Sequence, residues 1–87
     1  MFLHLGFDVV VPIEDIVVII GWAPKGKEKN KINKKFFRKE EKEGHIITIV
    51  EEKIKSLVIT NKERHYLSPI SKQTLAKRSI KKVFTGG

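Results

Sequence analysis

Residues 53–78 read KIKSLVITNKERHYLSPISKQTLAKR, and this stretch carries most of the structural information in the chain. Its β-branched and aromatic segments predict two strands, 57–60 and 64–67, separated by a polar turn at 61–63. Ser68 and Pro69 then break the sheet, and Ser71 is a suitable N-cap for a short helix whose Leu75 and Ile80 face inward. The stretch therefore predicts a hairpin followed by a C-terminal helix.

Further strands are predicted on the N-terminal side of this stretch. Residues 2–5 and 8–11 flank Gly6 and form a tight hairpin, which ends at Pro12. Residues 16–20 read IVVII and are β-branched throughout. Residues 46–50 form another strand, and we expect it to pair antiparallel with residues 55–60 across a turn at 51–54.

A lysine-rich segment separates these strands. Residues 23–44 hold nine Lys or Arg and four Glu, and they begin with a loop that contains Pro and Gly. A helix capped by Asn30 or Asn33 is predicted to run to about Glu43, with Gly44 as its stop. Ile32, Phe36 and the alkyl part of Lys39 form a narrow apolar stripe on this helix.

These elements predict an α+β fold, with a small antiparallel sheet of about five short strands, a basic middle helix and a short C-terminal helix. Eighty-seven residues make one domain, which we place at residues 1–83, followed by a frayed tail at 84–87.

The apolar surface of the strands exceeds what two short helices can cover. Strands 16–20, 46–50 and 57–59 are apolar on both faces, and exposed apolar faces usually mark interfaces. We therefore expect a homo-oligomer closed by symmetry. The alternative is that strand ends and loops of the same chain cover the second face.

The charge of the chain favours polyanionic partners. Its net charge is +8, and residues 53–82 alone hold nine Lys or Arg against one acid, which also gives +8. Nucleic acid is the first expectation and an anionic membrane the second, although a basic surface can also serve solubility alone. Pro12, Glu14 and Asp15 interrupt the apolar residues near the N-terminus, so no membrane span is expected. The absence of cysteine makes a reducing cytoplasm the expected compartment.

Candidate phosphate contacts fall into three groups. Lys and Arg neutralise phosphates and release counterions, while the aromatic platforms that stack single-stranded bases are sparse here. Duplex DNA is therefore favoured over single strands, and the alternative for each group is a solvated basic face. The groups are Lys53 and Lys55 at the predicted turn, Lys34, Lys35 and Arg38 on the middle helix, and Lys77 and Arg78 near the C-terminus, with Lys81 and Lys82.

The sequence gives little support to catalysis, a cofactor or a metal site. GWAPKGK, residues 21–27, has the spacing of a phosphate-binding loop, but Glu28 stands where Ser or Thr would hold magnesium. The three histidines are too scattered for a metal-ligand motif, and we interpret each as a strand-edge residue. The acids Glu40, Glu41 and Glu43, with Glu28, are interpreted as a solvated helix face.

Two blocks of sequence carry a family resemblance. HLGFDVVVPIEDIVVII, residues 4–20, and KSLVITNKERHYLSPISKQTLAKR, residues 55–78, resemble the extracellular matrix regulatory proteins of the RemA/RemB type, and more closely the RemB branch. The resemblance spans nearly the whole chain except the lysine-rich insert around residues 23–31. It implies a small α+β fold that assembles into rings and, for the RemA branch, a DNA-binding activator of biofilm matrix genes.

The resemblance also implies where DNA would bind. The arginine-bearing turn of the RemA branch falls on residues 52–55, where Lys53 and Lys55 keep positive charge and Glu52 replaces an arginine. A further arginine of that branch falls on Asp15, a reversal of charge. The leading hypothesis is a ring-forming DNA-binding regulator, and the alternative is an oligomeric module that binds an acidic protein partner and no DNA.

Overall fold

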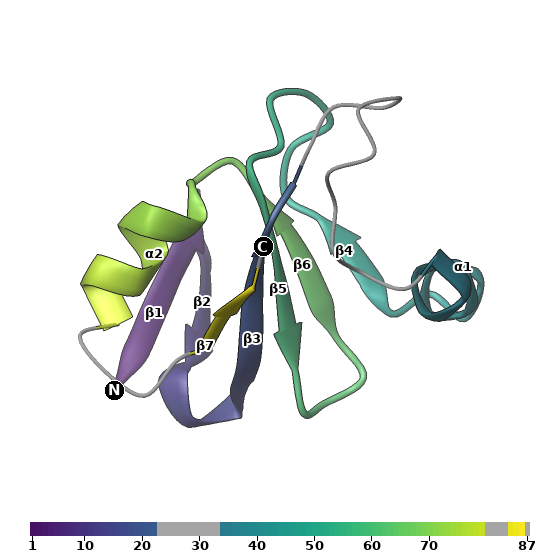
Figure 1. Cartoon of the computed structure of the whole chain (residues 1–87), viewed down its shortest axis with the longest axis horizontal. Coiled ribbons are helices and arrows are strands. Elements are labelled where there is room, and N and C mark those ends of the chain that lie inside the picture. The colour runs from purple at the N-terminus through teal and green to yellow at the C-terminus, as the bar shows by residue number, and fades with distance from the viewer. Residues whose placement is uncertain (23–33, 80–83, 87) are drawn as a thin grey trace.

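The computed structural model of the protein describes residues 1–22, 34–79 and 84–86, and it has an α+β fold (Figure 1). In chain order its elements are β1 (Phe2–Gly6), β2 (Val9–Pro12), the short 3₁₀-helix η1 (Ile13–Asp15), β3 (Ile16–Gly21), α1 (Lys34–Lys42), β4 (Ile46–Thr48), β5 (Ser56–Thr60), β6 (His65–Ser68), α2 (Lys72–Ser79) and β7 (Phe84–Gly86).

The predicted N-terminal hairpin is confirmed, and it forms a separate two-stranded sheet of β1 and β2. Its tight turn uses two residues with positive φ, Gly6 at 128° and Phe7 at 51°. The register shifts between His4 and Gly6, so that Leu5 has no register partner on β2. A bulge of this kind bends a strand and increases its twist.

The second sheet contains five strands in the order β4-β6-β5-β3-β7. The antiparallel pairing of β5 with β6 agrees with the sequence, and β3 also pairs antiparallel with β5. Two features differ from the prediction of one antiparallel sheet of about five strands. The chain has seven described strands in two sheets, and the pairs β4–β6 and β3–β7 are parallel.

The predicted antiparallel pairing of residues 46–50 with residues 55–60 is wrong. Both edges of β5 are occupied, one by β3 and the other by β6, so β4 adds to the free edge of β6 instead. The connection from β4 to β5 is held to β6 at both ends. Ile49 N–H donates to the Leu67 carbonyl at 3.1 Å, and Lys55 N–H donates to the Ser68 carbonyl at 2.8 Å. A connection that crosses over β6 replaces the expected hairpin.

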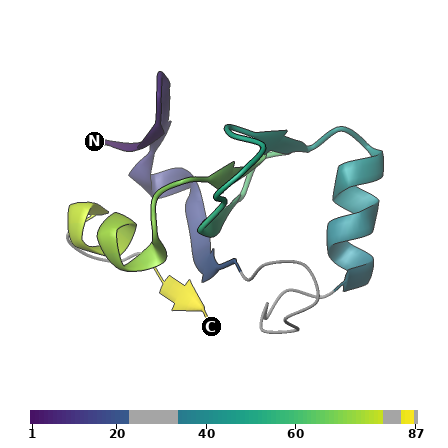
Figure 2. The same ribbon diagram turned by 90° about the horizontal axis from the view of Figure 1, so that it is seen from above.

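Alternate side chains of the five-stranded sheet enter two different apolar clusters, because successive residues of a strand point to opposite faces. The first cluster lies between the sheet, the β1–β2 hairpin and α2, and it contains Leu3, Leu5, Val11, Ile16, Ile19, Val58, Tyr66 and Leu75. The second contains Ile20, Leu57 and Leu67, and Trp22 and Phe37 pack against it. Figure 2 shows α2 and α1 at opposite ends of the molecule. Trp22 and α1 thus cover part of the second face, where Val18, Ile54 and Ile59 remain only partly buried.

Both helices have the predicted boundaries where the structure describes them. Gly44 follows α1 with a φ of 79°, as expected of a glycine that ends a helix. Ser71 caps α2, since its Oγ accepts the Thr74 N–H at 3.2 Å, and Leu75 is buried. The proposed caps Asn30 and Asn33, and the apolar positions Ile32 and Ile80, lie outside the described residues.

Residues 84–86 differ from the expected frayed tail. They form β7, which pairs in parallel with residues 18–20 of β3. Among the described residues, no helix is long and apolar enough to cross a membrane.

Candidate nucleic-acid interface

Lys53 and Lys55, called here the loop group, lie in the connection between β4 and β5. Both side chains are exposed. The backbone of Lys55 is held on both sides, because its N–H donates to the Ser68 carbonyl at 2.8 Å and its carbonyl accepts the Trp22 N–H at 3.0 Å. Lys53 has a φ of 62°, in the left-handed region that non-glycine residues rarely adopt. The fold thus holds the base of this loop in place while its cations face solvent.

The acids of the same loop reduce its positive charge. Glu51 and Glu52 are exposed beside the loop group. Two carboxylates and two ammonium groups give this connection no net charge, so the loop group by itself is a weak attractor of phosphate. Any strong attraction to a polyanion needs cations from elsewhere.

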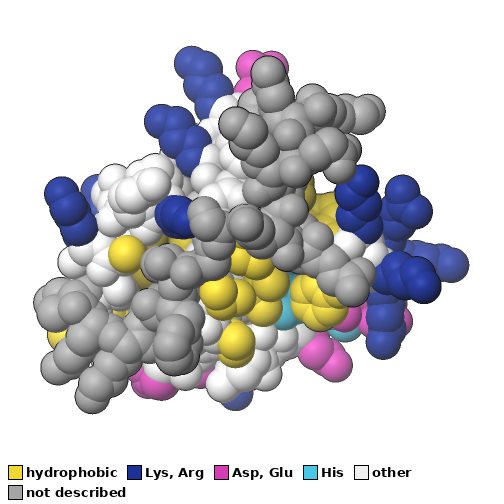
Figure 3. Space-filling model, in the orientation of Figure 1, with side chains coloured by type: hydrophobic (Ala, Val, Ile, Leu, Met, Phe, Trp, Pro, Cys, Tyr) yellow, Lys and Arg dark blue, Asp and Glu magenta, His cyan; other side chains and the backbone are white. Residues whose placement is uncertain are grey.

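Lys34, Lys35 and Arg38, the helix group, lie in the N-terminal half of α1 and are exposed. Lys77 and Arg78, the α2 group, occupy the last turn of α2 and are exposed as well. Figure 3 shows Lys and Arg side chains gathered over α1 at one end of the visible face, with others set apart at the opposite upper side. Since α1 and α2 lie at opposite ends, one chain does not bring the three groups into one patch.

Asp15 precedes Ile16, which pairs with Thr60, whereas Lys55 precedes Ser56, which pairs with Gly21. Asp15 and the loop group therefore lie at opposite ends of the β3–β5 pair. The Asp15 carbonyl accepts the Asn61 N–H at 2.8 Å, which ties η1 to the turn between β5 and β6. Thr60 closes that turn, because its Oγ1 donates to the Arg64 carbonyl at 2.6 Å and accepts the Lys62 N–H at 3.1 Å.

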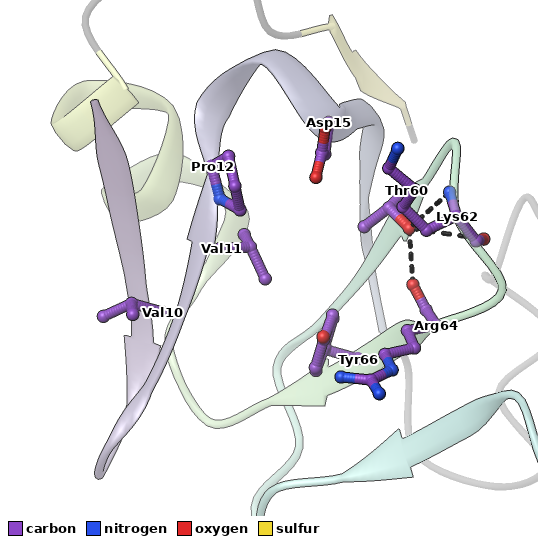
Figure 4. Close-up of a pocket in the computed structure, with 8 residues that line it drawn as sticks. All are labelled: Val10, Val11, Pro12, Asp15, Thr60, Lys62, Arg64 and Tyr66. Carbon is purple, nitrogen blue, oxygen red and sulfur yellow. Dashed lines mark hydrogen bonds between the residues drawn. The ribbon is translucent and has the colours of Figure 1, made fainter.

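A hollow of about 370 Å³ opens between β2 and this turn (Figure 4). Arg64 reaches into it beside Tyr66, and Asp15 lies on the side of η1. The cations Lys62 and Arg64 were not among the predicted site residues. The sequence offered one indication of Lys62 and Arg64 as site residues, since both lie in a polar turn within the basic half of the chain.

A second cluster of charged and polar side chains joins α1 to the sheet. Oε1 of Glu40 accepts a hydrogen bond from Nδ1 of His45 at 2.8 Å and another from Nε2 of His65 at 3.1 Å. Nδ1 of His65 accepts the Thr60 N–H at 3.2 Å, so the proton of a neutral His65 lies on Nε2. Glu43 adds a second carboxylate, with its Oε1 at 3.8 Å from Nδ1 of His45.

The cluster shifts the titration of two of its members. The hydrogen bond from His45 lowers the pKa of Glu40. Burial acts in the opposite direction and raises this pKa, whereas the hydrogen bond from His65 lowers it further. The hydrogen bond to Glu40 raises the pKa of His45, against the effect of burial, and the charges of Glu40, Glu63 and Glu43 add to the rise. Three carboxylates thus act on one imidazole.

The interpretation of the acids as a solvated helix face agrees with the exposure of Glu41 and Glu43 but is wrong for Glu40. Glu40 is not part of a solvated face, since its side chain is only 13% exposed. His45 and His65 are not isolated strand-edge residues, because β4 and β6 are paired and bring both to the same carboxylate. Residues 40, 45 and 65 are linked by the parallel β4–β6 pair, which the order of strands in the sequence did not indicate. Residues 23–27 and Glu28 of the phosphate-loop-like segment lie outside the described residues.

Taken together, these features define a small, basic α+β protein whose exposed cations stand on a loop and two helices around a mixed sheet. The family model described as RemA-like, extracellular matrix regulatory protein A-like, matches residues 2–79, and the chain therefore belongs to this family. The description is that of a regulatory protein, which agrees with the resemblance found in the sequence. The match does not separate the RemA and RemB branches. A comparison with curated proteins found no significant match.

Proposed function

We propose that this protein is a DNA-binding regulator of the RemB type that acts as a ring-shaped homo-oligomer and grips the phosphate backbone of duplex DNA. The observation that carries the proposal is the loop group. The backbone of Lys55 is fixed by hydrogen bonds to Ser68 and Trp22, and both lysine side chains are exposed. Cations on a fixed loop lose less entropy on binding than cations on a mobile one.

Repetition around a ring supplies the affinity that one chain lacks. The loop group shares its connection with Glu51 and Glu52, and the other basic groups lie at opposite ends of the molecule. In an oligomer, each copy presents the same cations, and several weak contacts add as avidity. The helix group and the α2 group then contribute to the field that attracts DNA.

An exposed apolar surface on the N-terminal hairpin supports the assembly. Leu3, Leu5 and Val11 face the core, whereas apolar side chains on the other face remain in solvent. Phe7 is 70% exposed at the tip of the hairpin, although its positive φ is unusual for an aromatic residue. Apolar surface of this kind marks an interface. Its residues, called here the hairpin face, are Phe2, Phe7 and Val10.

The DNA contact is tested by two variants of the same loop, one that replaces its lysines by glutamates and one that replaces its glutamates by lysines. We expect Lys53→Glu with Lys55→Glu to abolish binding to duplex DNA, and Glu51→Lys with Glu52→Lys to strengthen it, since all four side chains are exposed. Binding is measured by fluorescence anisotropy at two salt concentrations, with circular dichroism to check the fold. Equal affinity of the native chain and both variants would refute the assignment of the loop group.

The ring is tested by mass in solution. The chain weighs 10.0 kDa, so light scattering should give a several-fold multiple of that mass, and Val10→Glu should return it to one chain. A native mass of one chain would refute the ring. A multi-chain mass without DNA binding at low salt would instead favour the alternative, an oligomeric module that binds an acidic protein partner. Asp15 and Glu52 motivate this alternative, because they stand at positions where the RemA branch has arginines.

A further inference from the structure

The side-chain cluster at the C-terminal end of α1 has the composition of a metal site. Ligand atoms of Glu40, Glu43 and His45 all lie within 4.8 Å of one another. Imidazole and carboxylate are both ligands that Zn²⁺ accepts in proteins. From Zn–N and Zn–O distances of about 2.0–2.2 Å, a tetrahedral ion requires ligand atoms to be about 3.4 Å apart. The observed separations from Nδ1 of His45, 2.8 Å to Glu40 and 3.8 Å to Glu43, lie on either side of that value.

The histidine behind the cluster orients one of these ligands. His65 is buried, with a side chain only 5% exposed, and its Nδ1 is occupied by the Thr60 N–H. It therefore has no free lone pair for a metal and acts as a donor from Nε2 to Glu40. A hydrogen bond from a second residue to a ligating carboxylate is a regular feature of metal sites, because it fixes the orientation of the ligand.

The electrostatics of the cluster favour a cation. Glu40 lies in the last turn of α1 and Glu43 directly follows the helix, where the partial negative charge of the helix dipole disfavours acids. Glu40 is largely withdrawn from water, with a side chain only 13% exposed. Glu40 and Glu43 thus place two carboxylates beside one imidazole nitrogen. A divalent ion would offset this excess of negative charge.

We propose that Glu40, Glu43 and His45 form a binding site for Zn²⁺, with His65 as the residue that positions Glu40. Nδ1 of His45 is the coordinating nitrogen, and the ring proton then lies on Nε2. The three ligands leave a fourth position of the tetrahedron for water. The ion joins the last turn of α1 to His45, the residue directly before β4, and so it fastens the basic helix to the edge strand of the sheet. The proposal does not depend on DNA binding.

Zinc binding to the full chain tests the site. Isothermal titration in metal-free buffer should give one Zn²⁺ per chain, and Co²⁺ in its place should give the visible absorption of a four-coordinate ion. Glu43→Gln removes one ligand from a half-exposed position whose 3.8 Å contact contributes little to the fold. We expect it to weaken Zn²⁺ binding by at least about tenfold.

The matched control is Glu41→Gln, which removes the same charge from an exposed position of the same helix outside the cluster. It should bind Zn²⁺ as the native chain does. His45→Ala should abolish binding, and circular dichroism shows whether that variant is folded. Absence of stoichiometric binding to the native chain would overturn the proposal, and so would equal weakening by Glu43→Gln and Glu41→Gln, since that result would indicate charge alone.

Discussion

Ser68 Oγ donates a hydrogen bond of 2.6 Å to the carbonyl oxygen of Leu5, 63 residues earlier in the chain. Both residues are buried, and Leu5 lies at the bulge where β1 has no register partner on β2. The hydroxyl of Ser68 also accepts the Ile70 N–H at 3.0 Å. One side chain therefore satisfies a carbonyl that the hairpin leaves unpaired, and it joins the two sheets at the end of β6.

Replacing this serine should destabilise the fold. Ser68→Ala leaves the Leu5 carbonyl buried without its donor, and a buried unsatisfied polar group costs about 1–3 kcal/mol. Urea denaturation should show this decrease in the free energy of unfolding. Gln73→Ala, at an exposed position of α2, serves as the control and should stay within about 0.5 kcal/mol of the native chain. Equal stability of the two variants would mean that the bond contributes nothing net.

Gly6 and Gly44 allow backbone strain to be separated from steric conflict. Both have positive φ, 128° and 79°, but a Cβ at Gly6 would lie 3.1 Å from Cδ and Cγ of Pro69, whereas one at Gly44 would meet nothing within 4 Å. We expect Gly44→Ala to cost about 1–2 kcal/mol through its left-handed conformation. Gly6→Ala should cost about 2–4 kcal/mol, because strain and close contact add. Thermal unfolding of both variants measures the difference, and a larger loss for Gly44→Ala would contradict the close packing of Gly6 on Pro69.

The docking of α1 can be followed through the one tryptophan of the chain. The rings of Trp22 and Phe37 lie 5.3 Å apart between centroids, and both pack on the second apolar cluster. Phe37→Ala should expose Trp22 to water and shift its fluorescence emission to longer wavelength, with a loss of about 1–3 kcal/mol from reduced apolar burial. Arg38→Ala, an exposed neighbour on the same helix, should leave the emission unchanged. An unshifted spectrum for Phe37→Ala would show that α1 does not shield the tryptophan.

Local signals in the sequence were sufficient for most elements of the fold. The β-branched residues of β3 and β5, Gly44 after α1 and Ser71 before α2 all act through neighbouring backbone, and each has its predicted role. The two sequence blocks that carry the family resemblance also meet in space, where Leu5 and Gly6 contact Ser68 and Pro69. The sequence identified both blocks without indicating that they touch.

The order of strands in the sheet depends on which strands compete for the two edges of β5, and no local sequence pattern indicates the outcome. Adjacent strands commonly pair, which is why β4 was expected beside β5, but β6 and β3 occupy both edges of β5. The cluster of Glu40, His45 and His65 was missed for the same reason. Its members are brought together by the β4–β6 pair, so spacing along the chain gives no indication of it. The exposed cations were predictable from composition, whereas their distribution over opposite ends of the molecule was not.

The proposed DNA contact leads to a prediction about salt. Each phosphate contact that is lost should reduce the slope of log affinity against log salt by about 0.9 on duplex DNA. Lys53→Ala with Lys55→Ala should therefore lower the slope by up to about 1.8 for each chain that touches the duplex, without changing which sequence is preferred, because phosphate contacts carry no sequence information. Fluorescence anisotropy across a range of salt concentrations gives the slope directly.

The α2 group provides the comparison for this measurement. Lys77→Ala with Arg78→Ala removes the same number of charges from exposed positions at the far end of the molecule from α1. If the loop group touches phosphates and the α2 group acts only through the long-range field, the loop variant should lower the slope more than the α2 variant, since screening already weakens distant charges at physiological salt. Equal slopes for the two variants would argue for a diffuse basic surface in place of a defined contact at the loop.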